Sequence, residues 1–321
     1  ELYLCSAVDV SAIIQARRQA EAANQAKDAF LSNMSHEMRT PLNGIMGMAQ
    51  LVSQGELNAA QRSLLDTMFH CGEALESMID DLLDLSSLYT GVLKLKSESF
   101  NLEDALNRLV HLFRPEAEDK GLDLIIHYPA DGPVHFIGDG GRIRQMLAHL
   151  VGNALKFTSA GYVSVEISFD NIEQESIWTR IRVTDSGIGM SEEQQLLLNS
   201  LLSQVDMLPS RKQGGIGLGL SLCRELARVM GGVLYTDSRP NEGTEFTITL
   251  PLQTDPAAPP RQIKETPWRA KPMVIVSASP HMRDMLGALA RHWQFEADIC
   301  HTGEEVLALL KQANAMERPY W

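Results

Sequence analysis

Apolar residues recur every three or four positions along the first quarter of the chain, on both sides of a break near Gly55. Before the break they are Ile13, Ala16, Ala20, Ala23, Phe30, Met34, Met38, Leu42, Ile45, Ala49 and Val52, and after it Leu64, Leu65, Met68, Leu75, Met78, Ile79, Leu82 and Leu85. This spacing predicts a coiled-coil entry helix followed by a long helical hairpin within residues 12–95. Two hairpins joined as a dimeric four-helix bundle are the simplest way to bury the stripe, so we expect a homodimer.

The pattern changes after Gly91. Asn101 and Asp104 read as a helix cap, and the apolar residues from Leu102 to Phe113 form one helical face. Alternating, strand-like segments follow: DLIIHY, YVSVEISF, IWTRIRVTD, GGVLYTDS and TEFTITLPL. Helical segments separate them near residues 142–157 and 217–230. We expect an α/β domain over residues 96–252 with an antiparallel or mixed sheet.

The last part of the chain reads as a linker and a third unit. Four prolines fall between residues 253 and 270, which favours an extended linker. The segment MVIVSAS, a helix over residues 282–292 and the segment ADICHTGEEVLALLKQ then give a βαβα order. We interpret residues 271–321 as the N-terminal part of a larger domain, because a third strand is expected where the sequence stops.

Composition and charge exclude several classes of function. The 321 residues carry a formal net charge of −13 and no basic run, which disfavours nucleic acid as a partner. The four cysteines are far apart, so no zinc site or disulfide framework is indicated. No apolar run approaches the roughly 18 residues of a membrane span. We expect a cytoplasmic, reducing location and no membrane contact for this segment, with membrane anchoring of a longer protein left open.

Four short motifs carry the candidate chemistry. They are SHEMRTP at residues 35–41, HLVGNALKFT at 149–158, DSGIGM at 185–190 and GGIGLGL at 214–220. A single glycine cluster reads equally well as a turn, but in this order the four resemble the sequence boxes of sensor histidine kinases. The resemblance covers about residues 25–252. It implies a phosphoacceptor bundle followed by an ATPase domain of the Bergerat α/β-sandwich type, which gyrase and MutL share without the SHEMRTP helix.

The resemblance assigns the phosphoacceptor chemistry to the first motif. His36 is implied as the residue that attacks the γ-phosphate of ATP, since a neutral imidazole is a competent nucleophile near pH 7. Glu37 is implied as the general base that orients the ring and accepts its proton. Thr40 matches the position that orients water for dephosphorylating a response regulator, so a phosphatase activity is also expected.

The remaining motifs are implied to bind ATP and Mg²⁺. Asn153 is expected to hold Mg²⁺, and Lys156 to meet phosphate charge. Asp185 is expected to accept a hydrogen bond from the adenine amino group, which favours ATP over GTP. The glycines are expected to allow close approach to the base or the phosphates. They are Gly187, Gly189, Gly215, Gly217 and Gly219. Arg211 and Lys212 are expected to reach the phosphates, and Thr244 to line the adenine pocket.

Three features depart from the family pattern or extend it. His149 stands where the family usually has Asn, so a replaced hydrogen bond, a weakened kinase and a plain interior His all remain open. The third unit resembles a flavodoxin-like receiver domain, but Ser277 and Ala278 replace the two expected acidic Mg²⁺ ligands, which indicates a pseudoreceiver. The strand-like segment in residues 1–11 resembles the end of a preceding PAS-type sensor domain.

The resemblance predicts a hybrid histidine kinase that phosphorylates His36 and passes the group to a response regulator or phosphotransfer protein. A catalytically weakened kinase that acts as a regulatory or heterodimerising scaffold is the main alternative. An ATP-driven clamp ATPase is a third, and SHEMRTP argues against it.

Overall fold

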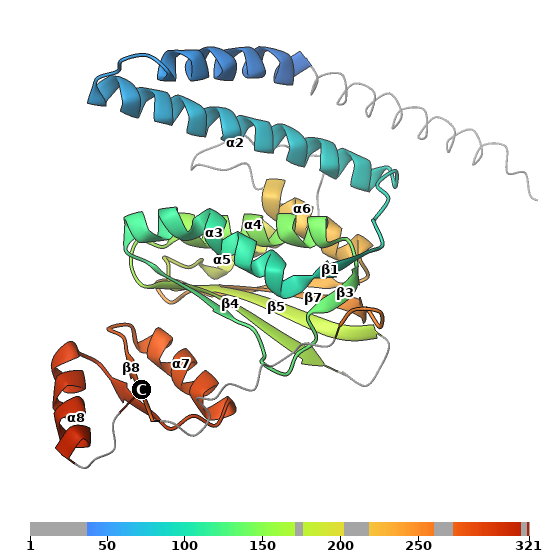
Figure 1. Cartoon of the computed structure of the whole chain (residues 1–321). Coiled ribbons are helices and arrows are strands. Elements are labelled where there is room, and N and C mark those ends of the chain that lie inside the picture. The colour runs from blue at the N-terminus through green and yellow to red at the C-terminus, as the bar shows by residue number, and fades with distance from the viewer. Residues whose placement is uncertain (1–36, 171–175, 202–217, 260–271, 316–319, 321) are drawn as a thin grey trace, which may run out of the picture. The chain divides into compact units, whose positions relative to one another are not determined.

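Figure 1 shows a computed structural model of the chain, which describes residues 37–170, 176–201, 218–259, 272–315 and 320. The chain divides into two units, one of residues 1–94 and 210–225 and the other of residues 95–209 and 226–321. The strand predicted within residues 1–11 and the coiled-coil entry helix predicted before His36 lie outside the described residues.

The first unit contains the predicted helical hairpin. Residues 37–53 are helical, and α2 runs over Ala59–Tyr89 (Figure 1). The second helix begins at a capping box: the Asn58 side chain accepts from the Gln61 N–H at 2.9 Å, and the Gln61 side chain accepts from the Asn58 N–H at 3.0 Å. A Cβ on Gly72 would lie 2.1 Å from the sulfur of Met46, so the two helices approach closely at this glycine.

The apolar stripe of this unit is only partly buried within one chain. The side chains below a tenth exposed are Leu42, Ala49, Leu65, Ile79, Leu85 and Leu88. Those left exposed include Met38, Ile45, Val52, Leu64, Met68, Leu75 and Met78. An ion pair between Arg39 and Asp80, 2.6 Å long, joins the two helices beside the stripe. The hairpin therefore has an inner face and a second apolar face that the described chain does not cover.

The second unit contains a seven-stranded mixed sheet. Its strands are β1 (Glu98–Asn101), β2 (Asp123–His127), β3 (His135–Gly138), β4 (Tyr162–Asp170), β5 (Ser176–Asp185), β6 (Val233–Arg239) and β7 (Gly243–Thr254). The path is β1-β3-β7-β5-β4-β2, with β6 also paired to β7. The β2–β4 pair is parallel, and the others are antiparallel. The mixed sheet agrees with the prediction.

Helices cover one face of this sheet. They include α3 (Leu102–Lys120) and α4 (Gly140–Phe157), which lie over the sheet in Figure 1. Asn101 caps α3 by accepting from the Asp104 N–H at 3.0 Å, as predicted. Asp139 caps α4 by accepting from the Arg142 N–H at 3.0 Å. The helices α5 (Glu192–Leu201) and α6 (Leu218–Val229) complete this part of the chain, and α6 crosses the division between the two units.

Side chains along β4 and β5 alternate between the two faces of the sheet. On β4 and β5 the side chains facing the helices are buried, among them Val163, Val165, Ile181, Val183 and Asp185. The residues between them are polar and partly exposed, because their side chains point to the opposite face. The core thus lies between the helices and one side of the sheet, and we call the other side the open face.

The C-terminal residues form the predicted βαβα order. The elements are β8 (Met273–Val276), α7 (Pro280–His292), β9 (Ala297–Cys300) and α8 (Gly303–Ala315), and β8 pairs with β9 in parallel. The linker was predicted to start at residue 253, but Gln253 and Thr254 belong to β7. They pair with Ile137 and Phe136 of β3, which extends the strand by two residues.

No described helix is long and apolar enough to cross a membrane.

Candidate functional site

Asp185 is a buried carboxylate at the end of β5. Its residue is 5% exposed, and it is paired in register with Thr244 at the start of β7. The Gly187 N–H donates to its Oδ1 at 2.8 Å. The backbone of Thr244 and the side chain of Thr158 also hydrogen-bond to it. Because these donors come from three segments, the carboxylate is held at the meeting point of β5, β7 and the end of α4.

The pKa of Asp185 is raised above its ordinary value. Burial is the main cause, because removal from water disfavours the charged form. The hydrogen bonds from Gly187, Thr244 and Thr158 oppose the rise, since each stabilises the carboxylate. Burying the Asp185 carboxylate costs free energy, because the charge loses its contact with water. A carboxylate buried at such a cost is a candidate for binding a ligand.

The loop after Asp185 passes too close to other backbone for any side chain at Gly187 or Gly189. A Cβ on Gly187 would lie 2.4 Å from the Phe157 carbonyl oxygen. Gly189 has φ of +62°, and a Cβ there would lie 1.8 Å from the Arg239 carbonyl oxygen. These glycines are therefore required by the local backbone, in addition to any role in approaching a ligand.

Hydrogen bonds fix this loop against α4 and β6. The Ile188 N–H donates to the Phe157 carbonyl at 3.3 Å, which ties the loop to the end of α4. On the other side, the Met190 N–H donates to the Ser238 hydroxyl at 2.8 Å. Ser238 also lies 2.9 Å, oxygen to oxygen, from the Thr244 hydroxyl.

Thr158 and Ser238 are site residues that the sequence reasoning did not single out. Thr158 is the last residue of the HLVGNALKFT motif, and its place as the C-cap of α4 was the available signal. Its hydroxyl is 2.7 Å from the Ala154 carbonyl, within the last turn of the helix. Ser238 gave no signal beyond being a small polar residue near a strand end, because its neighbours become clear only once β6 is paired with β7.

The predicted residues of α4 lie in its second half. Asn153 and His149 are one turn apart on one side of the helix, and both are half-buried. Lys156 is exposed, with its ammonium nitrogen 5.4 Å from the centre of the Phe157 ring. The ligand-binding roles of Asn153 and Lys156 stay predictions.

Other predicted site residues belong to the first unit or lie outside the described residues. Glu37 and Thr40 are exposed on the first helix of the hairpin, and Gly219 lies in the first turn of α6. His36, Arg211, Lys212, Gly215 and Gly217 lie outside the described residues. The structure thus brings together Asp185, Gly187, Gly189 and Thr244, and adds the end of α4 to them.

Comparison with protein families identifies both domains. Residues 26–91 match the model of the His Kinase A (phospho-acceptor) domain. Residues 138–254 match the model described as Histidine kinase-, DNA gyrase B-, and HSP90-like ATPase. The second match contains Asn153, Asp185 and Thr244.

Curated relatives match about three quarters of the chain. The sensor histidine kinase GacS of Pseudomonas protegens is 40% identical over 237 residues, which are 74% of this chain and 26% of that protein. The histidine-protein kinase BarA of Escherichia coli K12 is 37% identical over 241 residues, which are 75% of this chain and 26% of that protein. The chain thus spans about a quarter of the length of these relatives.

A solved structure resembles most of the chain. The crystal structure of full-length ShkA in complex with AMPPNP superposes with a TM-score of 0.67 and 29% sequence identity, over 87% of this chain and 57% of that one. The chain therefore contains a phosphoacceptor domain and a histidine-kinase-type ATPase domain. The match to the ATPase family supports ATP binding.

Proposed function

We propose that this chain is the catalytic core of a hybrid sensor histidine kinase, which phosphorylates His36 from ATP and passes the group to a response regulator. The observation that carries the proposal is the buried Asp185 carboxylate, held by backbone N–H groups beside a glycine loop in the matched ATPase domain. The His36–Glu37 pair in the matched phosphoacceptor domain supplies the second half of the reaction.

Asp185 would select adenine. Its carboxylate can accept a hydrogen bond from the exocyclic amino group of adenine, whereas guanine presents a carbonyl oxygen at that place. Two acceptors facing each other in a buried site would be destabilising, because neither would have a donor. The hydroxyls of Thr158, Ser238 and Thr244 supply adjustable polar groups around the same base.

The phosphates would lie toward the end of α4. Lys156 is exposed and can meet negative charge. Among the described residues no group of three His, Cys, Asp or Glu side chains could hold a metal. Mg²⁺ is nevertheless compatible with this site, since it usually keeps several waters and binds substrate phosphates with few protein ligands. Asn153 would provide an amide oxygen, and the ion would neutralise phosphate charge when bound.

In the proposed reaction, one imidazole nitrogen of His36 forms a bond to the γ-phosphorus of ATP. The bond from that phosphorus to the bridging oxygen breaks, and ADP leaves. The imidazole loses a proton, and Glu37 accepts it from the other ring nitrogen. Glu37 is exposed on the helix, so it can be reached by an incoming ATPase domain. Thr40, one turn further along, would orient water for the separate hydrolysis that dephosphorylates a response regulator.

The phosphoacceptor domain would act as a homodimer. The apolar residues left exposed on the hairpin support this proposal, because a stripe of this kind in water favours association. We infer that a second hairpin covers it and completes a four-helix bundle. A response regulator or phosphotransfer protein would then meet the phosphorylated helix. We place the segment in the cytoplasm, downstream of a PAS-type domain.

The C-terminal βαβα unit would be the first part of a pseudoreceiver. Ser277 and Ala278 supply no carboxylate at the end of β8. Instead, the guanidinium of Arg283 donates to the Ser277 carbonyl at 2.6 Å and to the Ala278 carbonyl at 3.0 Å. A fixed positive charge beside these carbonyls disfavours a divalent cation there, so we do not expect this unit to accept a phosphoryl group.

A weakened kinase that acts as a scaffold is the second candidate function, favoured by His149 in place of the family's Asn. Incubation with γ-labelled ATP and Mg²⁺ separates the candidates. A kinase retains label on the protein, a scaffold binds ATP without retaining label, and a clamp ATPase releases labelled phosphate continuously. The proposal requires retained label that unlabelled ATP suppresses and unlabelled GTP does not.

A further inference from the structure

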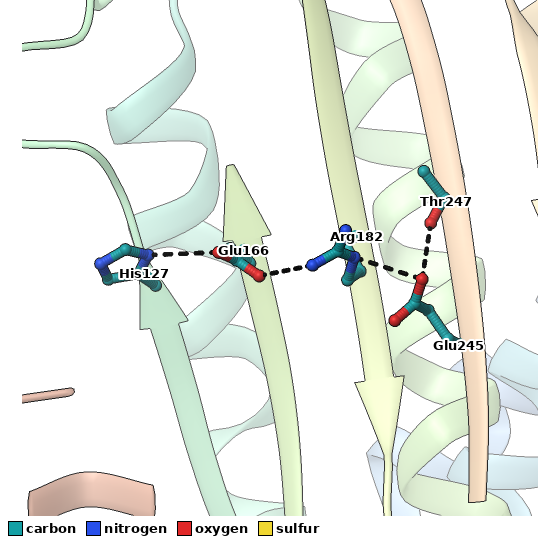
Figure 2. Close-up of polar contacts among 5 residues, drawn as sticks. All are labelled: His127, Glu166, Arg182, Glu245 and Thr247. Atoms are coloured by element: carbon teal, nitrogen blue, oxygen red, sulfur yellow. Dashed lines mark hydrogen bonds and ion pairs between the residues drawn. The ribbon is translucent and has the colours of Figure 1, made fainter. Parts of the chain in front are cut away.

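Four charged or titratable side chains cross the open face of the sheet in a row (Figure 2). The Nδ1 atom of His127 lies 3.8 Å from Glu166 Oε1, and Arg182 Nη1 lies 2.9 Å from Glu166 Oε2. Arg182 Nε lies 3.2 Å from Glu245 Oε1. The Thr247 hydroxyl donates to the same Glu245 oxygen at 3.2 Å. We call His127, Glu166, Arg182 and Glu245 the polar row.

The ion pairs of the polar row contribute little to the stability of the fold. Each of its side chains is about two-fifths exposed, and ion pairs at such exposure contribute little because water competes with them. The polar row keeps this face of the sheet hydrophilic, and its ion pairs hold the charged side chains in fixed directions. Those properties suit a surface that binds a partner and releases it again.

Helix α7 contacts this face at one end of the row. The rings of Tyr162 on β4 and His281 on α7 have centroids 3.8 Å apart. At the other end of the helix, His292 Nε2 lies 3.2 Å from Asp131 Oδ2. Ile125 points to the open face in register with Ser164, yet it is only 5% exposed. An apolar residue buried on this face requires a cover.

A cavity of about 360 Å³ separates α7 from the strands. The sheet contributes His127, Glu166 and Arg182 to its wall, and α7 contributes His281 and Met285. The contact is therefore incomplete, because a ring contact and an ion pair join α7 to the sheet while an unfilled space remains beside them. An interface of this kind is expected to open more readily than a packed core.

Beyond α7, the described residues leave large side chains of the same face exposed. Trp178 on β5 is 39% exposed and Tyr235 on β6 is 62% exposed, and both point to the open face by the alternation of their strands. The burial is local to the β2–β4 edge, where α7 lies. Because the burial is confined to this edge, the C-terminal unit makes a specific contact there and does not cover the sheet nonspecifically.

We propose that the β2–β4 end of the open face is a docking surface for the C-terminal unit of the same chain, which binds through α7. The occupant is this unit because α7 already supplies a ring in contact with Tyr162, an ion-pair partner for Asp131 and a wall of the cavity. Its tether follows β7 directly, so the effective concentration of α7 at this face is high.

The docking surface is connected to the loop that follows Asp185. The Tyr162 N–H donates to the Ser186 hydroxyl at 2.9 Å, and the Ser186 N–H donates to the Tyr162 carbonyl at 3.1 Å. Asp185 itself points to the helix-covered face, so α7 does not cover it. A docked C-terminal unit would thus restrain the start of β4, which lies beside the candidate nucleotide site, while leaving that site open.

The test is cross-linking of cysteine pairs in the whole chain, in a background with Cys5→Ser and Cys71→Ser. One pair combines Tyr162→Cys with His281→Cys, and a second, independent pair combines Asp131→Cys with His292→Cys. The control combines Tyr235→Cys with His281→Cys, because Tyr235 lies on the same face but three strands away, about 14 Å at ordinary strand spacing. A short bifunctional maleimide is added to each folded variant.

Docking predicts that both contact pairs link within one chain at least about tenfold faster than the control pair. Mass spectrometry of mixed isotope-labelled and unlabelled chains distinguishes links within a chain from links between chains. Equal rates for contact and control pairs would overturn the proposal, and so would links found only between chains. This readout requires neither ATP nor phosphorylation, so it stands or fails independently of the proposed kinase function.

Discussion

Asp185 and Thr244 face each other across the antiparallel pair β5–β7, and the Thr244 backbone hydrogen-bonds to the Asp185 carboxylate. Both residues are less than a tenth exposed. The two motifs are 59 positions apart in the sequence, and strand pairing makes them neighbours. The direction of the carboxylate is therefore set by the sheet, and this makes it a fixed acceptor for a flat, hydrogen-bonding ligand.

We expect Asp185→Asn to weaken ATP binding by roughly 10- to 100-fold, because a hydrogen bond to a charged group contributes about 1.5–3 kcal/mol. The asparagine can still accept from Gly187 through one oxygen, so the loop should keep its path. Titration calorimetry measures the affinity. A parent chain that bound GTP and ATP equally well would contradict the adenine-selecting role of Asp185.

The same substitution should change how stability depends on pH. Because burial raises the pKa of Asp185 in the folded state, its contribution to stability is full below the unfolded value near 3.8 and is lost as pH rises through the raised value. Asparagine does not titrate, so the variant does not lose stability over this pH range. The melting temperature of the variant relative to the parent should therefore rise across that window and stay level above it. A relative melting temperature that falls over the same window would show that the folded pKa is lowered instead.

Gly189→Ala should disrupt the loop, because a Cβ there would meet the Arg239 carbonyl oxygen. The matched control is Gly121→Ala, since Gly121 has φ of +65°, close to the +62° of Gly189, but nothing lies within 4 Å of its Cβ position. Both substitutions should carry about 1–2 kcal/mol of backbone strain. Gly189→Ala should cost further stability and ATP binding. Chemical denaturation and nucleotide titration measure the two effects, and equal losses in both variants would refute the close-approach argument.

Leu75→Asp should convert a dimer to a monomer. Leu75 is 45% exposed on the uncovered face of the hairpin, and a charge buried there in a dimer would have no evident partner. Ser77→Asp is the control, because Ser77 is exposed on the opposite side of α2. Analytical ultracentrifugation of the whole chain at micromolar concentration reads out the mass. A parent chain that is already monomeric would exclude the four-helix bundle.

Much of the architecture could be predicted because its signals are local. The 3.6-residue period located the hairpin, and the cap at Asn101 located the start of α3. The short strands β1 and β3 were missed because four residues such as ESFN carry too little alternation to stand out. Helix α5 was missed as well. These elements form through pairing and packing with distant segments, which the sequence does not display.

The candidate site was predictable only where a motif marked it. Asp185, Gly187 and Gly189 come from one contiguous motif, and the structure places them together with Thr244. Thr158 and Ser238 enter the site through the end of α4 and through β6, so their roles depend on the fold. The relation between His36 and the ATPase site stays a prediction, because His36 lies outside the described residues.

Glu37→Gln should separate chemistry from binding. Loss of a positioned base typically costs roughly 10²-fold or more in rate, whereas ATP affinity should be unchanged because Glu37 belongs to the hairpin and not to the ATPase domain. Single-turnover labelling gives the rate, and nucleotide titration gives the affinity. A variant that labels at the parent rate would remove Glu37 from the proton transfer.

Phosphorylation of His36 is the central claim, and the chemical identity of the labelled residue tests it most directly. The whole chain is incubated with γ-labelled ATP and Mg²⁺, and the label is then challenged with acid and with alkali. The account predicts label that is lost in acid, survives alkali and is absent from His36→Ala, while that variant binds ATP normally. Label that persists in His36→Ala, or that survives acid in the parent chain, would contradict it.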